Sequence, residues 1–166
     1  MIYDCRAATM DDLACIWEKN IRANADDPRW AAWRDEYIGY NRSGAAQTYV
    51  VLCDGDPVGE GTLLFSPDCG AIAGRTCLAD GAAVANINAL RIEKTHEGKG
   101  HISALVRLME ADAVQHGCTR LTIGVEAKEE RNQAIYRHWG YDRLILTAVE
   151  DGETVYYLEK EIKASR

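Results

Sequence analysis

The chain is 166 residues long, a length that suits one domain with a sizeable hydrophobic core. Hydrophobic residues make up 47% of it and charged residues 27%, as in globular proteins in water, and no apolar run approaches the ~20 residues of a membrane span. The net charge of −7 disfavours nonspecific binding to nucleic acid, which depends on basic patches. We therefore expect one domain over residues 1–166, with neither a membrane nor nucleic acid as partner.

The first part of the chain predicts one strand and two helices. Ile2 to Ala7 is typical of a short strand, and Thr9 is placed as the N-cap of the following helix, whose first turn is acidic. The segment Asp26-Asp27-Pro28 breaks this helix. Aromatic residues from Trp30 onward indicate a second helix that runs into Gly44.

The middle of the chain predicts three strands and a long loop. Thr48 to Cys53 and Val58 to Phe65 are apolar runs on either side of a turn, as in a pair of partner strands. Residues 66–81 contain a proline and glycines without periodicity, which predicts a long loop, and long ordered loops are often functional. Val84 to Ile92 is the expected central strand.

The last part predicts two more helices and three strands. An amphipathic helix is expected after residue 100, and Leu121 to Val125 alternates as a strand. A helix carrying Tyr136 follows, and Tyr141 to Val149 and Thr154 to Ile162 flank an Asp-Gly turn. The expected order is β-α-α-β-β-β-α-β-α-β-β.

The six cysteines are scattered along the chain, at Cys5, Cys15, Cys53, Cys69, Cys77 and Cys118. No Cys-x-x-Cys pair is present, and the histidines are not grouped with the thiols, so we expect reduced cysteines and no metal site. The N-terminus lacks the basic and then apolar layout of a signal peptide, which favours a cytoplasmic protein.

The segment Glu97–Leu105, with the sequence EGKGHISAL, predicts an anion-binding turn at the start of a helix. Gly98 and Gly100 let the backbone turn tightly and approach a ligand. The first N–H groups of a helix have no intrahelical acceptor, and the positive end of the helix dipole favours a phosphate or pyrophosphate. By itself, this pattern also fits a plain tight turn.

A second motif, Arg131–Tyr141, strengthens the interpretation. Asn132 and Tyr136 are four residues apart and share one helix face, and Gly140 is placed to end that helix. The strand, glycine turn, helix, strand and Asn-x-Ala-x-x-Tyr-x-x-x-Gly-Tyr segment together resemble the GNAT superfamily of acetyl-CoA-dependent N-acetyltransferases. The resemblance is firmest over residues 86–141.

The resemblance implies an α/β (α+β) fold, a mixed and mostly antiparallel twisted sheet flanked by helices. Two of its strands, through Leu90–Ile92 and Ile123–Val125, are expected to splay apart and bind acetyl-CoA. Free backbone groups of residues 90–92 would bond the pantetheine arm, and an amide near Ile92 could polarise the thioester. The expected cofactor-binding residues are Leu90, Arg91, Ile92, Glu97, Gly98, Lys99, Gly100, His101, Ile102, Ser103, Asn132 and Tyr136.

The chain departs from the family pattern at two positions in this turn. Glu97 stands where an arginine or glutamine is usual, and Ile102 stands where a small residue is usual. A carboxylate beside a pyrophosphate is unfavourable unless it points away, and Ile102 adds bulk where the helix meets the cofactor. Lys99 and neighbouring basic residues could restore the positive potential.

Tyr136 resembles the family's general acid, which protonates the departing CoA thiolate. The alternative is an aromatic ring that packs in the core. Glu126 is the candidate general base, although a solvated carboxylate at a strand end is an equal alternative and Glu93 is a weaker second choice. A further alternative is that no dedicated base exists and that proximity does most of the work. Asn132 resembles the residue that binds the pantetheine arm, or it satisfies amides at a helix start.

Asp26, Asp27, Trp30 and Trp33 lie in the region that lines the acceptor side in related proteins. Acidic residues beside aromatic rings suit a cationic amine, and the alternative is a solvated face over packed indoles. The chain is thus expected to be an acyltransferase that acetylates a small primary amine, such as an aminoglycoside, a polyamine or an amino-acid-like compound. Alternatives are a non-catalytic CoA-binding sensor or scaffold and a protein N-terminal or lysine acetyltransferase. A homodimer is one option for its assembly.

Overall fold

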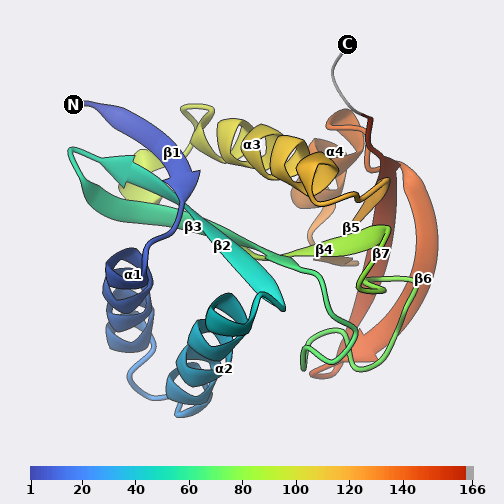
Figure 1. Cartoon of the computed structure of the whole chain (residues 1–166), viewed down its shortest axis with the longest axis horizontal. Helices are drawn as coiled ribbons and strands as arrows, with labels where there is room; N and C mark the ends of the chain where they lie inside the picture. The colour runs from blue at the N-terminus through green and yellow to red at the C-terminus, as the bar shows by residue number, and fades with distance from the viewer. Residues whose placement is uncertain (164–166) are drawn as a thin grey trace. The chain divides into compact units, whose positions relative to one another are not determined.

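The protein was analysed as a computed structural model that describes residues 1–163 (Figure 1). Its strands are β1 (Tyr3–Ala7), β2 (Ala46–Cys53), β3 (Asp56–Leu64), β4 (Val84–Ile92), β5 (Arg120–Glu126), β6 (Arg143–Glu150) and β7 (Glu153–Glu161). Its helices are α1 (Met10–Ala23), α2 (Arg29–Ser43), α3 (His101–Gln115) and α4 (Glu130–His138), with a short 3-10 helix η1 (Lys94–His96). The strands form one sheet in the order β1-β2-β3-β4-β5-β7-β6.

This order of elements confirms the expected mixed, mostly antiparallel fold. β4 and β5 pair in parallel, whereas β1–β2, β5–β7 and β6–β7 pair antiparallel. The one element that the sequence did not predict is η1, which lies between β4 and the glycine turn. A single 3-10 turn is too short to produce a hydrophobic period, which explains why the pattern missed it.

The chain falls into two compact units, which are described separately. The first unit contains Met1–Leu63 and Ala89–Met109, and the second contains Leu64–Asn88 and the chain from Glu110 onward. β4 and α3 each contribute residues to both units. A single domain over residues 1–166 remains a prediction.

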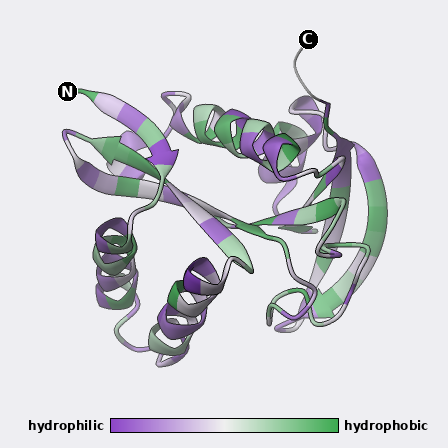
Figure 2. Ribbon diagram, in the orientation of Figure 1, coloured by the Kyte–Doolittle hydropathy of each residue, from purple (hydrophilic) through white to green (hydrophobic). Residues whose placement is uncertain are grey.

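In the first unit, Thr9 is the N-cap of α1, as expected. The Thr9 hydroxyl accepts from the Asp12 amide, and the Asp12 carboxylate accepts from the Thr9 amide and from Arg6. Burial alone would raise the pKa of Asp12, but the hydrogen bonds from Thr9 and Arg6 hold it below its usual value. Figure 1 shows α1 and α2 side by side, and Figure 2 shows that hydrophilic residues predominate along α2.

Successive residues of β3 face opposite sides of the sheet in the first unit. Glu60 meets Asn20 of α1, whereas a side chain at Gly61 would come within 2.9 Å of Leu90 and Met109. Gly61 therefore lets α3 and the end of β4 approach the sheet closely. No helix among residues 1–163 has both the length and the apolar character needed to span a membrane.

In the second unit, β6 and β7 form a hairpin around Asp151-Gly152, where both residues have positive φ. The 66–81 segment forms no regular helix or strand, as predicted, but it is firmly packed because Cys69, Ile72 and Leu78 are buried. Asp80 ends it by accepting hydrogen bonds from the amides of residues 82–84. These bonds hold the pKa of Asp80 below its usual value.

Candidate cofactor and acceptor site

The glycine turn in the first unit has the geometry that an anion cradle needs. Gly98 and Gly100 have φ angles of 73° and 81°, in the region that favours glycine. The Ala104 amide donates to the Gly100 carbonyl at 3.0 Å, which is the first backbone bond of α3. Within residues 1–163, the amides of residues 98–103 donate to no protein acceptor. A row of unpaired amides at a helix N-terminus is suited to a pyrophosphate.

The two departures from the family pattern lie at the ends of this turn. Glu97 follows η1, its amide donates to the Lys94 carbonyl at 3.3 Å, and the residue is exposed. Its carboxylate therefore has room to turn toward water. Ile102 is half-buried, and Lys99 is exposed in the middle of the turn.

Tyr3 of β1 holds the turn from both sides, a contact that the sequence did not predict. Its hydroxyl shares a hydrogen bond of 2.7 Å with His96 Nδ1, and its ring stacks on His101 with 3.9 Å between ring centroids. Tyr3 and His96 are 93 positions apart in the chain, and only the fold brings them together. The residues that flank the amide row are thus anchored to the edge strand of the sheet.

The β4–β5 ladder ends before either strand does. It pairs Val84–Ile87 with Arg120–Ile123, although β4 continues to Ile92. Ala89, just beyond the ladder, has a positive φ of 54°, an unusual conformation for a residue with a side chain and one that bends the strand.

Among the described residues, the end of β4 in the first unit has no paired strand on one of its edges. The Glu93 amide donates to the Val58 carbonyl at 2.8 Å, so that residue faces β3. Because backbone groups alternate along a strand, those of Leu90 and Ile92 point to the opposite edge. This is the arrangement expected for groups that would bind the pantetheine arm.

In the second unit, α4 carries Tyr136 and Asn132. Tyr136 is half-buried against Trp139, and its hydroxyl has no hydrogen-bond partner among residues 1–163. Burial, with the negative charge of Glu129 nearby, raises the pKa of Tyr136 to about 12. The phenol is therefore neutral at ordinary pH and able to donate a proton. Asn132 Nδ2 lies 3.5 Å from Glu129 Oε2.

The two candidate bases already have cationic neighbours. Lys128 Nζ lies 3.4 Å from the Glu126 carboxylate, whose side chain is 38% exposed at the end of β5. In the first unit, Lys19 Nζ lies 3.2 Å from the Glu93 carboxylate. A substrate ammonium must therefore compete with a lysine at either position. The backbone around Glu126 is fixed, since Gln133 Nε2 donates to the carbonyls of Glu126 and Ala127.

Two of the residues predicted to bind a cationic amine, Asp27 and Trp33, contact an arginine of the chain itself. Asp27 accepts from the Arg29 guanidinium at 2.8 Å, and that guanidinium lies over the Trp33 ring. The hydrogen bonds from Arg29 lower the pKa of Asp27. Asp26 is exposed, and Trp30 packs edge-on against Trp33 at 5.2 Å. The assignment of these residues to substrate binding stays a prediction.

A buried carboxylate that the sequence analysis missed pairs with Arg91, whose guanidinium lies over the Trp30 ring. Glu60 is only 1% exposed, and it accepts from Asn20 Nδ2 at 2.7 Å and from Arg91 Nη2 at 3.3 Å. The signal for it was available, because Glu60 is the one charged residue within the apolar run Val58–Phe65. Charged residues are almost never fully buried unless they are paired.

The described residues bring no group of three or more His, Cys, Asp or Glu side chains together as a possible metal site. No disulfide joins the six cysteines, all of which lie within residues 1–163. Cys77 is exposed, and Cys69 is buried in the 66–81 segment. The expectation of a metal-free protein remains a prediction.

Comparison with known proteins agrees with this fold. The sequence matches the family model "Acetyltransferase (GNAT) family" over residues 8–141. The chain is similar to an N-acetyltransferase from Staphylococcus aureus Mu50, with a TM-score of 0.74 and 16% identity over 98% of this chain and 100% of that one. It is also similar to the Salmonella typhimurium acetyl transferase that modifies the N-terminal serine of 50S ribosomal subunit protein L7/L12 (TM-score 0.70, 13% identity, 97% and 95% covered).

A third similar structure is Arabidopsis thaliana NAA60 in complex with acetyl-CoA (TM-score 0.70, 14% identity, 97% and 99% covered). No curated protein sequence matches significantly. At such low identities the solved structures show the fold alone, whereas the family model covers most of the chain and confirms the resemblance read from the two motifs. By its sequence and its fold, the chain belongs to the GNAT family of acetyltransferases.

Proposed function

We propose that the protein transfers the acetyl group of acetyl-CoA to a primary amine on a small molecule. The observation that carries this proposal is the row of unpaired amides over residues 98–103 at the N-terminus of α3. Amides in this position bind phosphate groups without a metal ion. The free backbone edge at Leu90 and Ile92 adds groups that suit the amide-rich pantetheine arm.

In the proposed reaction, the amine nitrogen attacks the thioester carbonyl carbon, a C–N bond forms and the C–S bond breaks. The Ile92 amide stabilises the oxyanion, and Tyr136 gives its proton to the departing thiolate. The attacking nitrogen releases its surplus proton as the C–S bond breaks, and this proton restores the phenol of Tyr136 through water. The ammonium form of the acceptor first loses a proton to Glu126, directly or through water. Lys128 lies beside Glu126, so a substrate ammonium must compete with it for the carboxylate. We therefore assign much of the rate to the enzyme's holding the amine and the thioester close together.

The test is thiol release from acetyl-CoA with a panel of amines that includes aminoglycosides, polyamines, α-amino acids and a peptide with a free N-terminus. Turnover of a small amine supports the proposal. Turnover of the peptide alone would make the protein a protein N-terminal acetyltransferase. Tight binding of acetyl-CoA without turnover of any amine would indicate a non-catalytic CoA-binding module.

Glu97→Gln is expected to tighten acetyl-CoA binding about 2- to 5-fold at low salt, because it removes a repulsion next to the pyrophosphate. The gain should shrink as salt is added, since Glu97 is exposed and screening acts on exposed charges. Calorimetric titrations at two ionic strengths measure it. Glu36→Gln, at an exposed position of α2, is the matched control and should leave the affinity unchanged. Equal affinities of wild type and Glu97→Gln at low salt would show that this carboxylate points away from the cofactor.

Tyr3→Phe is expected to weaken acetyl-CoA binding about 2- to 10-fold, the cost of one lost hydrogen bond. The variant loses the bond to His96 but keeps the ring that stacks on His101, so η1 is released while the start of α3 stays anchored. Calorimetry measures the affinity for acetyl-CoA. Tyr40→Phe on α2 is the control and should leave this affinity unchanged. An unchanged dissociation constant would mean that the glycine turn keeps its conformation without Tyr3.

A further inference from the structure

The guanidinium of Arg91 lies over the rings of two neighbouring tryptophans, Trp17 and Trp30, in the first unit. Its central carbon is 4.8 Å from the centre of Trp30 and 5.5 Å from the centre of Trp17. The proposed function uses the backbone around Arg91 and assigns nothing to this side chain. Contact with the two rings holds the guanidinium by cation–π attraction, which uses none of its N–H donors.

Glu60 fixes Arg91 and is itself held in place by a second partner. Its two oxygens accept from different partners, Oε2 from Asn20 and Oε1 from Arg91. The carboxylate is 1% exposed, so it does not meet a ligand from solution. Glu60 is thus a positioning residue that orients the guanidinium, and its buried charge is compensated by that guanidinium.

Arg91 keeps donors that nothing in the described chain uses. A guanidinium has five N–H donors, and the pairing with Glu60 occupies a single nitrogen. Arg91 Nε and Trp17 Nε1 are both buried without a hydrogen-bond partner among residues 1–163. Buried donors are rarely left unpaired in a folded protein, and unpaired ones often mark a site. The Arg91 side chain is 34% exposed, so a ligand can reach it.

The position of Arg91 in the strand places its guanidinium group next to the expected acetyl group. Arg91 stands between Leu90 and Ile92, whose free backbone edge is assigned above to the pantetheine arm. Its side chain points to the α1 side, where Glu60 and Asn20 lie. Leu90 instead lies on the side of Gly61 and Met109. A ligand held by Arg91 would therefore lie one residue away from the acyl-binding backbone.

The spare donors and the occupied ring faces around this position favour an anionic group over a cationic one. Asp27 is neutralised by Arg29, and both Trp30 and Trp33 already carry an arginine guanidinium over their rings. A substrate ammonium would have to displace one of these guanidinium groups. A carboxylate would instead meet the spare donors of Arg91 in the planar, two-point geometry that carboxylates and guanidinium groups share.

We propose that Arg91 binds a carboxylate of the acceptor, and that the acceptors are amino-acid-like molecules that carry a carboxylate close to the acetylated amine. This inference rests on the proposed acetyl transfer and names its substrate class. Arg91 supplies the guanidinium group that binds the carboxylate. Glu60, which is itself held by Asn20, sets the orientation of this group. The indoles of Trp17 and Trp30 lie against it.

The test compares each of the twenty common α-amino acids with its carboxamide in the thiol-release assay. The wild-type protein should prefer the carboxylate form of its best acceptor about 10- to 100-fold in kcat/KM, the range expected for hydrogen bonds to a charged group. Arg91→Gln should lower kcat/KM for the amino acid by that factor and leave the carboxamide almost unchanged. The acetyl-CoA dissociation constant should stay constant, because the backbone of residue 91 is retained.

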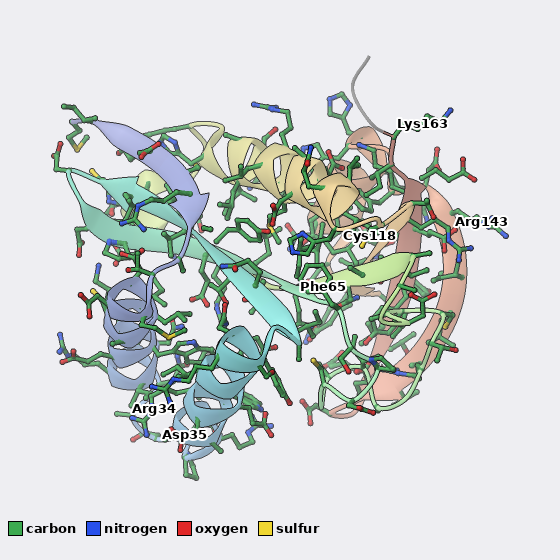
Figure 3. The ribbon with its side chains drawn as sticks, viewed as in Figure 1. Arg34, Asp35, Phe65, Cys118, Arg143 and Lys163 are labelled. Carbon is green, nitrogen blue, oxygen red and sulfur yellow. The ribbon has the colours of Figure 1, made fainter. Side chains whose placement is uncertain are left out.

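Two further variants separate binding from folding. Arg91→Gln leaves Glu60 as an unpaired buried charge, so the double variant Glu60→Gln with Arg91→Gln removes both charges together and should lose the same preference in a folded protein. Arg34→Gln, on α2 beside Asp35 (Figure 3), removes a half-buried arginine outside the cluster and should keep the preference.

The outcomes distinguish the inference from the proposed function. If wild type acetylates amines without preferring the carboxylate form, or if the preference survives in the double variant, the inference is wrong and acetyl transfer stands. If acetyl-CoA binds but no amine is acetylated, the proposed function is wrong and the inference falls with it.

Discussion

Replacing Gly100 with valine is expected to abolish acetyl-CoA binding in a protein that still folds. Gly100 has a φ of 81°, which is strained for any residue with a side chain and most of all for a β-branched one. The valine variant relieves this strain by moving the turn, and the amides of residues 98–103 then no longer converge on one point. Gly100 is exposed, with no neighbour within 4 Å of an added Cβ, so the core is not disturbed.

Calorimetry measures the loss of binding, and circular dichroism shows whether the fold is kept. Gly44→Val is the matched control, because Gly44 ends α2 with a φ of 83° and also has no neighbour within 4 Å. It suffers the same backbone strain away from the turn and should bind acetyl-CoA as wild type does. Wild-type affinity in Gly100→Val would remove the glycine turn from the cofactor site.

Local signals in the sequence predicted most of the fold. Thr9, three residues before Asp12, marks a capping box, and the structure contains both of its hydrogen bonds. Val84 to Ile92 was predicted as a strand with the bounds that β4 has. Capping boxes and apolar strand runs are defined by residues close together in the chain, so the sequence alone is enough to predict them. Strand ends elsewhere shifted by one or two residues, as at β6, because hydrogen-bond partners and not composition decide them.

The bend in β4 could not be predicted in the same way. Nothing in the sequence distinguishes Ala89 from its neighbours, yet it has a positive φ of 54° just beyond the end of the β4–β5 ladder. Alanine does not favour this conformation, so tertiary packing imposes it. The sequence did not indicate where the β4–β5 ladder ends, and this became visible only in the structure.

In the candidate site too, contacts within local motifs could be predicted from the sequence and contacts between distant residues could not. The glycine turn and Tyr136 are parts of local motifs. By contrast, Tyr3 and His96 are separated by 93 positions in the chain, and Glu60 and Arg91 by 31. A sequence pattern cannot show which distant side chains meet. Asp27 is a different case, because its partner Arg29 is only two positions away in the chain.

Tyr136→Phe is expected to slow acetyl transfer by ~10² to 10⁴, the usual effect of losing one positioned proton donor. The hydroxyl has no hydrogen-bond partner in the described chain, so its loss removes no structural bond. Because phenylalanine keeps the ring beside Trp139, the acetyl-CoA dissociation constant should stay near wild type. A fall in kcat with unchanged binding marks an interaction made mainly in the transition state.

The pH profile and a matched tyrosine complete this experiment. Burial raises the pKa of Tyr136 to about 12, so wild type should show no loss of rate from its ionisation across the ordinary assay range. Tyr141→Phe is the control, because the Tyr141 hydroxyl donates to Glu110 at 2.7 Å and serves the fold of the same unit. That variant should melt at a lower temperature and still turn over at the wild-type rate. If Tyr136→Phe keeps the wild-type rate with its best amine, Tyr136 only packs against its neighbours, and the thiolate takes its proton from water.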